Sequence, residues 1–119
     1  MAHPVDHEQR QHPRVVCRAP VQVSPIGEPA PRPALHLLAE DLSEAGLQLT
    51  SPEPFAVGKR LLLDIEVDEQ SAEAIRAVGL VVWMAHAAHQ ERWRLGVVLV
   101  EVSDPTRERL RGLVAALGH

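Results

Sequence analysis

The chain has 119 residues, of which 45% are apolar, 24% charged and 3% aromatic. This length and composition suit one domain with its own hydrophobic core. The net charge of −4 and the three aromatic side chains argue against DNA or RNA as the main ligand, because such binding needs clustered Lys and Arg and stacked aromatic rings.

Cysteine usage and hydropathy indicate the compartment. Cys17 is the single cysteine of the sequence, so no disulfide can form within the chain and a reducing compartment is expected. No cationic and apolar leader opens the sequence, and no apolar run approaches the ~18 residues of a membrane span. The sequence therefore predicts a cytoplasmic protein without a membrane partner.

The first half of the chain predicts a tail followed by paired strands. Residues 1–14 mix three His and two Pro with charges and no apolar periodicity, which is typical of a flexible tail. A β-branched strand follows over 15–23, where Pro20 indicates a sheet edge or a bulge, and residues 24–33 form a proline-rich loop. Strands are then expected over 34–42 and 46–50.

The second half predicts three further strands. Residues 60–67 place Leu and Ile or Val on one face at period two. Residues 75–84 are predicted as a long strand despite the helix propensity of residues 72–77, because Val and Trp favour extended structure, and Gly79 can mark a bulge. A last strand is expected over 93–102.

Helix signals appear only over residues 104–117. Asp104 can cap a helix and Pro105 suits its first position. Apolar residues recur at helical spacing at Leu110, Leu113, Val114 and Leu117, and Gly118 can end the helix. Six antiparallel strands and one amphipathic helix predict a small closed β-barrel over residues 15–119, with the helix packed on it.

Two short motifs contain the residues that are best suited to bind a ligand. Arg10 and Arg14 lie four apart on the tail, and their guanidinium forks suit phosphates or guanine edges. Asp41, Ser43 and Gly46 form a D-x-S-x-x-G pattern in the predicted turn between two strands. A carboxylate can accept hydrogen bonds from a base, a hydroxyl can donate and accept, and a glycine permits close approach. The combination suits a guanine nucleotide that carries phosphates.

Each motif also has a purely structural interpretation. Asp and Ser often bond to the local backbone of a turn in which Gly takes a positive φ. The four-residue spacing of arginines recurs between Arg14 and Arg18, but Arg18 falls inside a predicted strand, where a solvated or salt-bridged outer position is expected. Arg10 and Arg14 are therefore the expected pair.

R-x-x-x-R before a first strand, followed by D-x-S-x-x-G, resembles the signature of the PilZ domain family. Trp83 and the segment 94–97 are also similar to the family, and the resemblance covers the chain from about residue 9 onward. It implies a six-stranded barrel with a helix and a bacterial receptor for cyclic di-GMP. The arginine pair would grip phosphates and guanine edges, and Asp41, Ser43 and Gly46 would hold a guanine.

A stand-alone receptor is expected, because 119 residues leave no room for an output domain beside the barrel, and the sequence shows no catalytic centre and implies no cofactor beyond the ligand cyclic di-GMP. Binding would order the arginine tail against the barrel and signal to a downstream protein partner. The alternative is a PilZ-like adaptor that binds a protein and no nucleotide. The sequence leaves open whether one or two nucleotides bind, and whether the chain is a monomer or a weak homodimer.

The remaining candidate residues give weaker indications of a functional site. His86 and His89 lie close together, but no cysteine pair or H-E-x-x-H helix accompanies them, so no metal site is predicted and a metal-dependent hydrolase is a minor alternative. No G-x-S-x-G motif surrounds Ser43, so the sequence does not predict it as a catalytic nucleophile. Trp83 could stack on a nucleotide or pack at the rim of the core, and both interpretations stay open.

Overall fold

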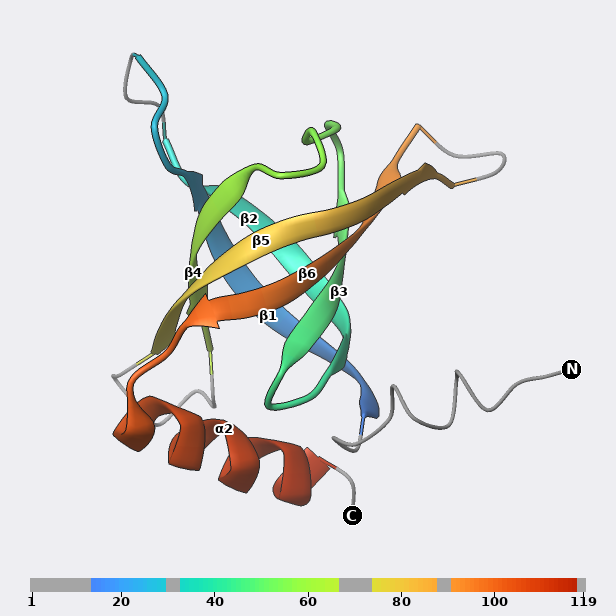
Figure 1. Ribbon diagram of the computed structural model, residues 1–119. Helices are drawn as coiled ribbons and strands as arrows, with labels where there is room; N and C mark the ends of the chain where they lie inside the picture. Colours follow the sequence, from blue (N-terminus) through green and yellow to red (C-terminus); the bar gives the residue numbers. More distant parts are fainter. Residues whose placement is uncertain (1–13, 30–32, 67–73, 88–90, 118–119) are drawn as a thin grey trace, which may run out of the picture.

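Six strands and one helix form the fold in this computed structural model, which describes residues 14–29, 33–66, 74–87 and 91–117. Figure 1 shows the strands wrapped around one another, with the helix across one end. The elements are β1 (Val15–Pro25), β2 (Leu35–Leu42), β3 (Gly46–Ser51), β4 (Arg60–Ile65), β5 (Ile75–His86), β6 (Trp93–Glu101) and α2 (Asp104–Leu117).

The strands close into a barrel in the order β1-β2-β3-β6-β5-β4, and β4 pairs with β1 to complete it. All six pairings are antiparallel. Closure gives every strand two neighbours, so no strand exposes an unpaired edge. The predicted six-stranded antiparallel barrel with a C-terminal helix is confirmed.

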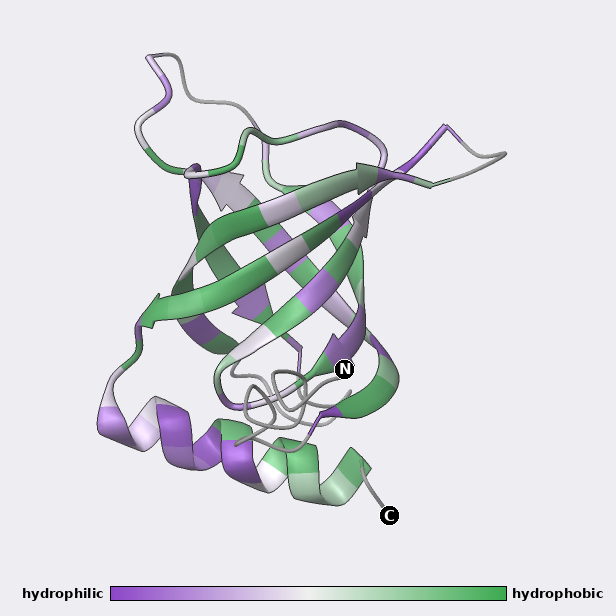
Figure 2. Cartoon of the chain, turned by 45° about the vertical axis from the view of Figure 1, so that its right-hand side comes forward, coloured by the Kyte–Doolittle hydropathy of each residue, from purple (hydrophilic) through white to green (hydrophobic). Residues whose placement is uncertain are grey.

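Alternation along the strands fills the barrel interior. In β4, Leu61, Leu63 and Ile65 are fully buried, while the residues between them are half-buried. Apolar and polar segments follow one another along the strands in Figure 2, as expected when successive side chains point to opposite faces. The other large, fully buried side chains are Val21, Val23, Leu42, Leu47, Leu49, Ile75, Val81, Leu95 and Leu110.

Bulges set the curvature of the barrel and the direction of one tryptophan. The pairing of β5 with β6 shifts at Val78/Gly79, which confirms the predicted bulge at Gly79. A second shift between Val81 and Trp83 was not predicted, and it leaves Val82 and Trp83 both exposed. Bulges add local twist and re-aim side chains.

Proline in β1 also coincides with an irregularity. The register between β1 and β2 shifts between Val16 and Ala19, immediately before Pro20. Of the two predicted roles for Pro20, an edge is wrong because the barrel is closed, and a nearby bulge is what the structure contains.

Helix α2 lies across one end of the barrel and closes it (Figure 1). Leu110 and Leu113 are buried and Val114 is half-buried, whereas Leu117 is exposed. The helix is hydrophilic in its first turns and hydrophobic in its last (Figure 2). The apolar stripe is thus confirmed over three of its four predicted positions. Gly118 lies outside the described residues, as do residues 1–13 of the predicted tail.

The helix is capped by Ser103, one residue before the predicted Asp104. The Thr106 N–H donates to Ser103 Oγ at 3.2 Å, and the Arg107 N–H donates to the Ser103 carbonyl at 2.9 Å. A side-chain oxygen that accepts from the third helical residue defines an N-cap. Asp104 is instead the first helical residue, where its negative charge interacts favourably with the positive end of the helix dipole.

Ser103→Ala is expected to lower the free energy of unfolding by about 1 kcal/mol, because it removes this cap. Asp104→Ala is the matched control and is expected to cost about 0.3–1 kcal/mol at most. Urea denaturation of both variants measures the difference. A larger loss in Asp104→Ala than in Ser103→Ala would contradict the assignment of the cap.

Candidate functional site

The two halves of the predicted site meet at one contact. Arg14 Nη2 lies 3.1 Å from Asp41 Oδ1, although the residues are 27 apart in the sequence. Pairing of β1 with β2 brings them together, since Val16 is the register partner of Asp41. Asp41 lies in β2 and Gly46 begins β3, so the turn is shorter than the predicted span of residues 41–46. The Arg14 side chain is 49% exposed and that of Asp41 23%, so solvent reaches both. Arg10, the other predicted arginine, lies outside the described residues.

Ser43 is buried and uses its hydroxyl inside the turn. Ser43 Oγ accepts from the Ala45 and Gly46 N–H groups at 3.1 and 3.2 Å and donates to the Gly46 carbonyl at 3.3 Å. The Ser43 N–H donates to the same carbonyl at 2.8 Å. These bonds satisfy the buried polar groups of the turn and fix its shape. The hydroxyl predicted to touch a ligand therefore has a structural role in the free protein.

A glycine is required at position 46 because β6 packs too close for a side chain, and not because of an unusual backbone conformation. A Cβ added at Gly46 would lie 2.3 Å from the Val97 carbonyl oxygen on β6. Among the described residues, the positive-φ glycines are Gly27 and Gly58. A positive φ at Gly46 is therefore wrong, whereas close approach, the other predicted reason for a glycine, is correct.

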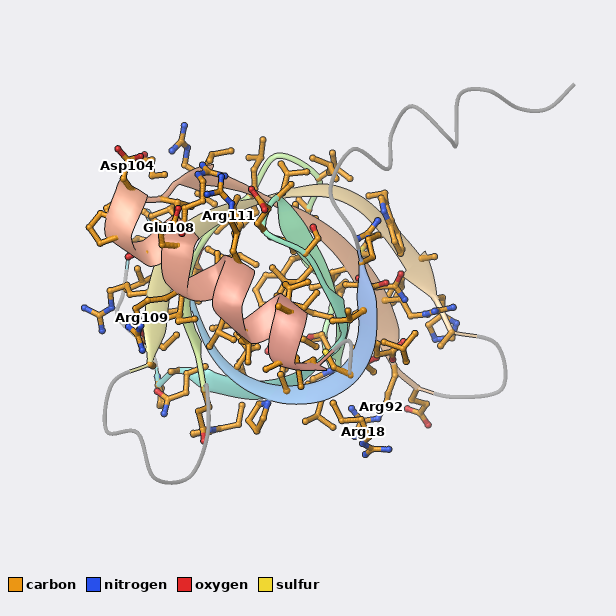
Figure 3. The ribbon with its side chains drawn as sticks, turned by 90° about the horizontal axis from the view of Figure 1, so that it is seen from below. Arg18, Arg92, Asp104, Glu108, Arg109 and Arg111 are labelled. Carbon is orange, nitrogen blue, oxygen red and sulfur yellow. The ribbon has the colours of Figure 1, made fainter. Side chains whose placement is uncertain are left out.

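The turn is fastened to β6 and to α2 by contacts that sequence reasoning missed. The Leu99 N–H donates to the Ala45 carbonyl at 2.8 Å. Arg111 Nε lies 3.0 and 3.1 Å from the two carboxylate oxygens of Glu44, and Arg107 Nη1 donates to the Glu44 carbonyl at 3.4 Å. The hydrogen bond to Glu44 raises the pKa of Arg111. Figure 3, in which the molecule is seen from below, shows Arg111 on α2 in front of the barrel.

A row of residues crosses the outer face of the barrel from the acid of the motif to the tryptophan. Asp41 pairs with Gln48, Gln48 with Gly96, and Gly96 with Trp83. The row spans three strand spacings, or roughly 14 Å. A Cβ at Gly96 would fall 1.9 Å from Trp83 Nε1, so the indole covers this glycine, and 42% of Trp83 stays exposed. Trp83 thus packs on the barrel surface with part of its ring accessible.

Glu40 anchors a polar network beside Asp41. Its carboxylate accepts from Gln48 Nε2 at 3.3 Å, from the Thr50 hydroxyl and from Arg94 Nη2 at 3.4 Å. These donors come from β3 and β6, so the network joins the outer faces of three neighbouring strands. The charge of Glu40 is balanced within the protein, whereas Asp41 depends on Arg14.

Comparison with known families decides the identity of the fold. The PilZ domain matches residues 8–116 of the sequence, which is most of the chain. This chain belongs to the PilZ domain family. PilZ domains are non-catalytic receptors for cyclic di-GMP. A search of curated proteins finds no match.

Several solved structures share the fold of this chain at low sequence identity. The chain is similar to the inhibitor of motility MotI/DgrA of Bacillus subtilis, with a TM-score of 0.74 and 18% identity over 90% of this chain and 50% of that one. It is also similar to the PilZ domain of YcgR from Escherichia coli, solved with c-di-GMP. The TM-score is 0.69 and the identity 14%, over 92% of this chain and 91% of that one. The PilZ domain of CeSA from a cellulose-synthesizing bacterium has a TM-score of 0.64 and 16% identity, over 90% of this chain and 99% of that one. This PilZ chain therefore spans half the length of MotI.

Histidines outside the PilZ signature form no metal centre in the described part of the chain. His86 packs edge-on against Trp93, with ring centroids 4.7 Å apart and an interplanar angle of 62°. His89 lies outside the described residues. No group of three His, Cys, Asp or Glu residues that could hold a metal occurs among the described ones. Among them, too, no helix is long and apolar enough to cross a membrane.

Cys17 is expected to react slowly with alkylating reagents in the folded PilZ domain. Burial raises the pKa of its thiol, the nearby charge of Asp41 adds to this, and Sγ donates to the Ala39 carbonyl at 3.5 Å. Because the raised pKa lowers the thiolate fraction, iodoacetamide labelling near pH 8.5 should be slower in folded than in urea-unfolded protein. Equal rates in the two states would contradict this expectation.

Proposed function

We propose that this chain is a bacterial cyclic di-GMP receptor that binds the dinucleotide between Arg10, Arg14 and the turn of Asp41, Ser43 and Gly46. The contact between Arg14 and Asp41 carries the proposal, since it brings an arginine of one motif to the acid of the other. Membership of a family of cyclic di-GMP receptors supports it.

The chemistry of the contact favours exchange with a ligand. An exposed ion pair contributes only about 0.2–1 kcal/mol, so separating Arg14 from Asp41 costs little. A guanine Watson–Crick edge offers N–H donors to the Asp41 carboxylate, and its Hoogsteen edge offers two acceptors to a guanidinium. Phosphate oxygens provide further acceptors for Arg10 and Arg14.

Ser43 and Gly46 support binding through the shape of the turn. Internal bonds of Ser43 and the close contact of Gly46 with β6 hold the turn before a ligand arrives. A site that is already in its bound shape loses less conformational entropy on binding. Asp41 is then the fixed acceptor and the arginines are the groups that close.

Signalling would follow from this closure. Ordering the arginine tail over the bound ligand changes the surface that a partner protein meets. The turn is joined to α2 through Glu44 and Arg111, which supplies a physical link from the ligand to the helix. A downstream protein partner would recognise the closed form.

Isothermal titration calorimetry with cyclic di-GMP, and with cyclic di-AMP and GTP at the same ionic strength, tests the function. Saturable binding is expected with cyclic di-GMP alone. If none of the three binds, the receptor assignment is wrong and a nucleotide-independent adaptor is favoured. Exposed Val82, Val98 and Val100 on the neighbouring strands β5 and β6 would then be the surface to examine for a protein partner.

A further inference from the structure

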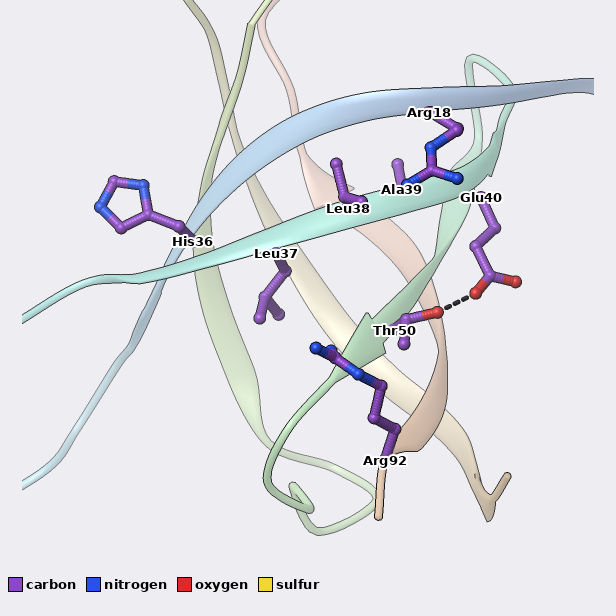
Figure 4. A pocket seen from close by; sticks show the side chains of 8 residues that line it. All are labelled: Arg18, His36, Leu37, Leu38, Ala39, Glu40, Thr50 and Arg92. Carbon is purple, nitrogen blue, oxygen red and sulfur yellow. Dashed lines mark hydrogen bonds between the residues drawn. The ribbon is translucent and has the colours of Figure 1, made fainter. Parts of the chain in front are cut away.

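A pocket lies on the outer face of the barrel beside the candidate site. It has a volume of about 450 Å³ and lies over β1, β2 and β3, with the segment before β6 at its edge. Figure 4 shows the side chains that line it, with arginines on two sides. The residues that matter here are Arg18, His36, Leu38, Glu40, Thr50 and Arg92.

Arg18 and Arg92 have no ion pair or hydrogen bond with any residue that the structure describes. Most other described arginines carry a carboxylate partner: Arg14, Arg60, Arg76, Arg94 and Arg111. Arg107 and Arg109 donate to backbone carbonyls. Both arginines are exposed, Arg18 in β1 and Arg92 immediately before β6, and Figure 3 places them on the same side of the barrel.

Glu40 does not neutralise these two arginines. Its carboxylate is already engaged by Gln48, by the Thr50 hydroxyl and by Arg94. The pocket therefore keeps two positive charges that no described side chain balances. Leu38 adds an apolar surface to the lining of the pocket, with 37% of its area exposed.

We propose that this pocket binds a small phosphorylated ligand through Arg18 and Arg92. Guanidinium forks match phosphate oxygens bidentately, and the volume falls within the range of about 300–1,000 Å³ typical of small-molecule sites. Leu38 contacts the apolar part of the ligand. Neither Arg14 nor Asp41 lines the pocket, which adjoins their contact at Glu40 and extends away from it past Leu38, about 10 Å from Asp41 along β2.

NMR titration of the ¹⁵N-labelled chain with AMP and with pyrophosphate tests the proposal. Saturable shifts are expected at the amides of Leu38, Glu40 and Thr50. Arg18→Ala and Arg92→Ala are each expected to weaken binding about tenfold or more, which corresponds to the loss of one charge-assisted contact. Both side chains are exposed, so the variants should keep the wild-type spectrum elsewhere.

Two controls separate this pocket from other basic surfaces. Arg76→Ala removes an exposed arginine that pairs with Asp64 on the outer face of β4 and β5, and should leave binding unchanged. Arg14→Ala should leave the shifts of Leu38, Glu40 and Thr50 unchanged, because Arg14 does not line the pocket.

Several outcomes would overturn the proposal. Shifts that grow linearly through the millimolar range, or wild-type affinity in both Arg18→Ala and Arg92→Ala, would mean that the pocket has no phosphate site. Shifts confined to residues 41–46 and lost in Arg14→Ala would assign the probes to the other site. Preference for a hexaglutamate peptide over AMP would make the pocket a site for acidic protein segments. None of these results depends on cyclic di-GMP.

Discussion

Arg14→Ala is expected to weaken the binding of cyclic di-GMP by about ten- to a hundredfold, and Arg10→Ala by a similar factor. Each substitution removes a guanidinium fork from phosphate or guanine acceptors, which is worth about 1.5–3 kcal/mol per charge-assisted contact. Because the Arg14 side chain is half exposed and forms one surface ion pair, its loss should barely change the free energy of unfolding. Calorimetric titration of both variants measures the effect.

Arg14→Lys and Arg76→Ala complete this experiment. Lysine keeps the charge but loses the planar fork, so an affinity between those of the wild type and Arg14→Ala is expected. Arg76→Ala changes the net charge equally but removes an arginine paired with Asp64, and should bind as the wild type does. Wild-type affinity in both Arg10→Ala and Arg14→Ala would show that the arginine pair does not hold the ligand.

Gly46→Ala is expected to lower the free energy of unfolding by roughly 3 kcal/mol, in the upper part of the range for overpacked sites. The added methyl group would meet the Val97 carbonyl oxygen at 2.3 Å. Backbone cannot rotate away as a flexible side chain can, so β3 and β6 would have to separate at the start of their ladder. Thermal and urea denaturation measure the loss.

Gly112→Ala is the matched control for this substitution. A Cβ at Gly112 would have no neighbouring atom within 4 Å, and the residue is exposed in the interior of α2. Alanine there should stabilise the protein by about 0.5–1 kcal/mol through helix propensity. If Gly46→Ala unfolds like the wild type, the close approach of β6 does not explain this glycine of the motif.

The strands were predictable because successive side chains of a barrel strand point alternately to the core and to solvent, which produces an alternating apolar pattern in the sequence. In β4, the alternation of Leu61, Leu63 and Ile65 with less buried residues is visible in the sequence itself. Observed strand limits differ from the predicted ones by two residues at most, as for β5, which continues to His86. The helix propensity of residues 72–77 did not prevent strand formation at the start of β5, where Ile75, Arg76 and Ala77 pair with β4.

The contacts of the candidate site were only partly predictable. The motif spacing identified Asp41 and Arg14, which the structure joins. The link between Glu44 and Arg111 could not be foreseen, since the two residues are 67 apart and α2 must first dock below the turn. For Ser43 the sequence left two roles open, because a D-x-S-x-x-G pattern does not reveal whether the serine faces a ligand or bonds to its own turn, and the structure shows the bonds within the turn.

Amide NMR of the protein saturated with cyclic di-GMP tests the central claim most directly. The claim is that the ligand is held between the arginine tail and the turn of β2 and β3. It predicts that the amides of residues 41–46 shift and that those of residues 6–14 sharpen and gain protection from hydrogen exchange. A saturated complex in which residues 6–14 are unchanged would contradict it.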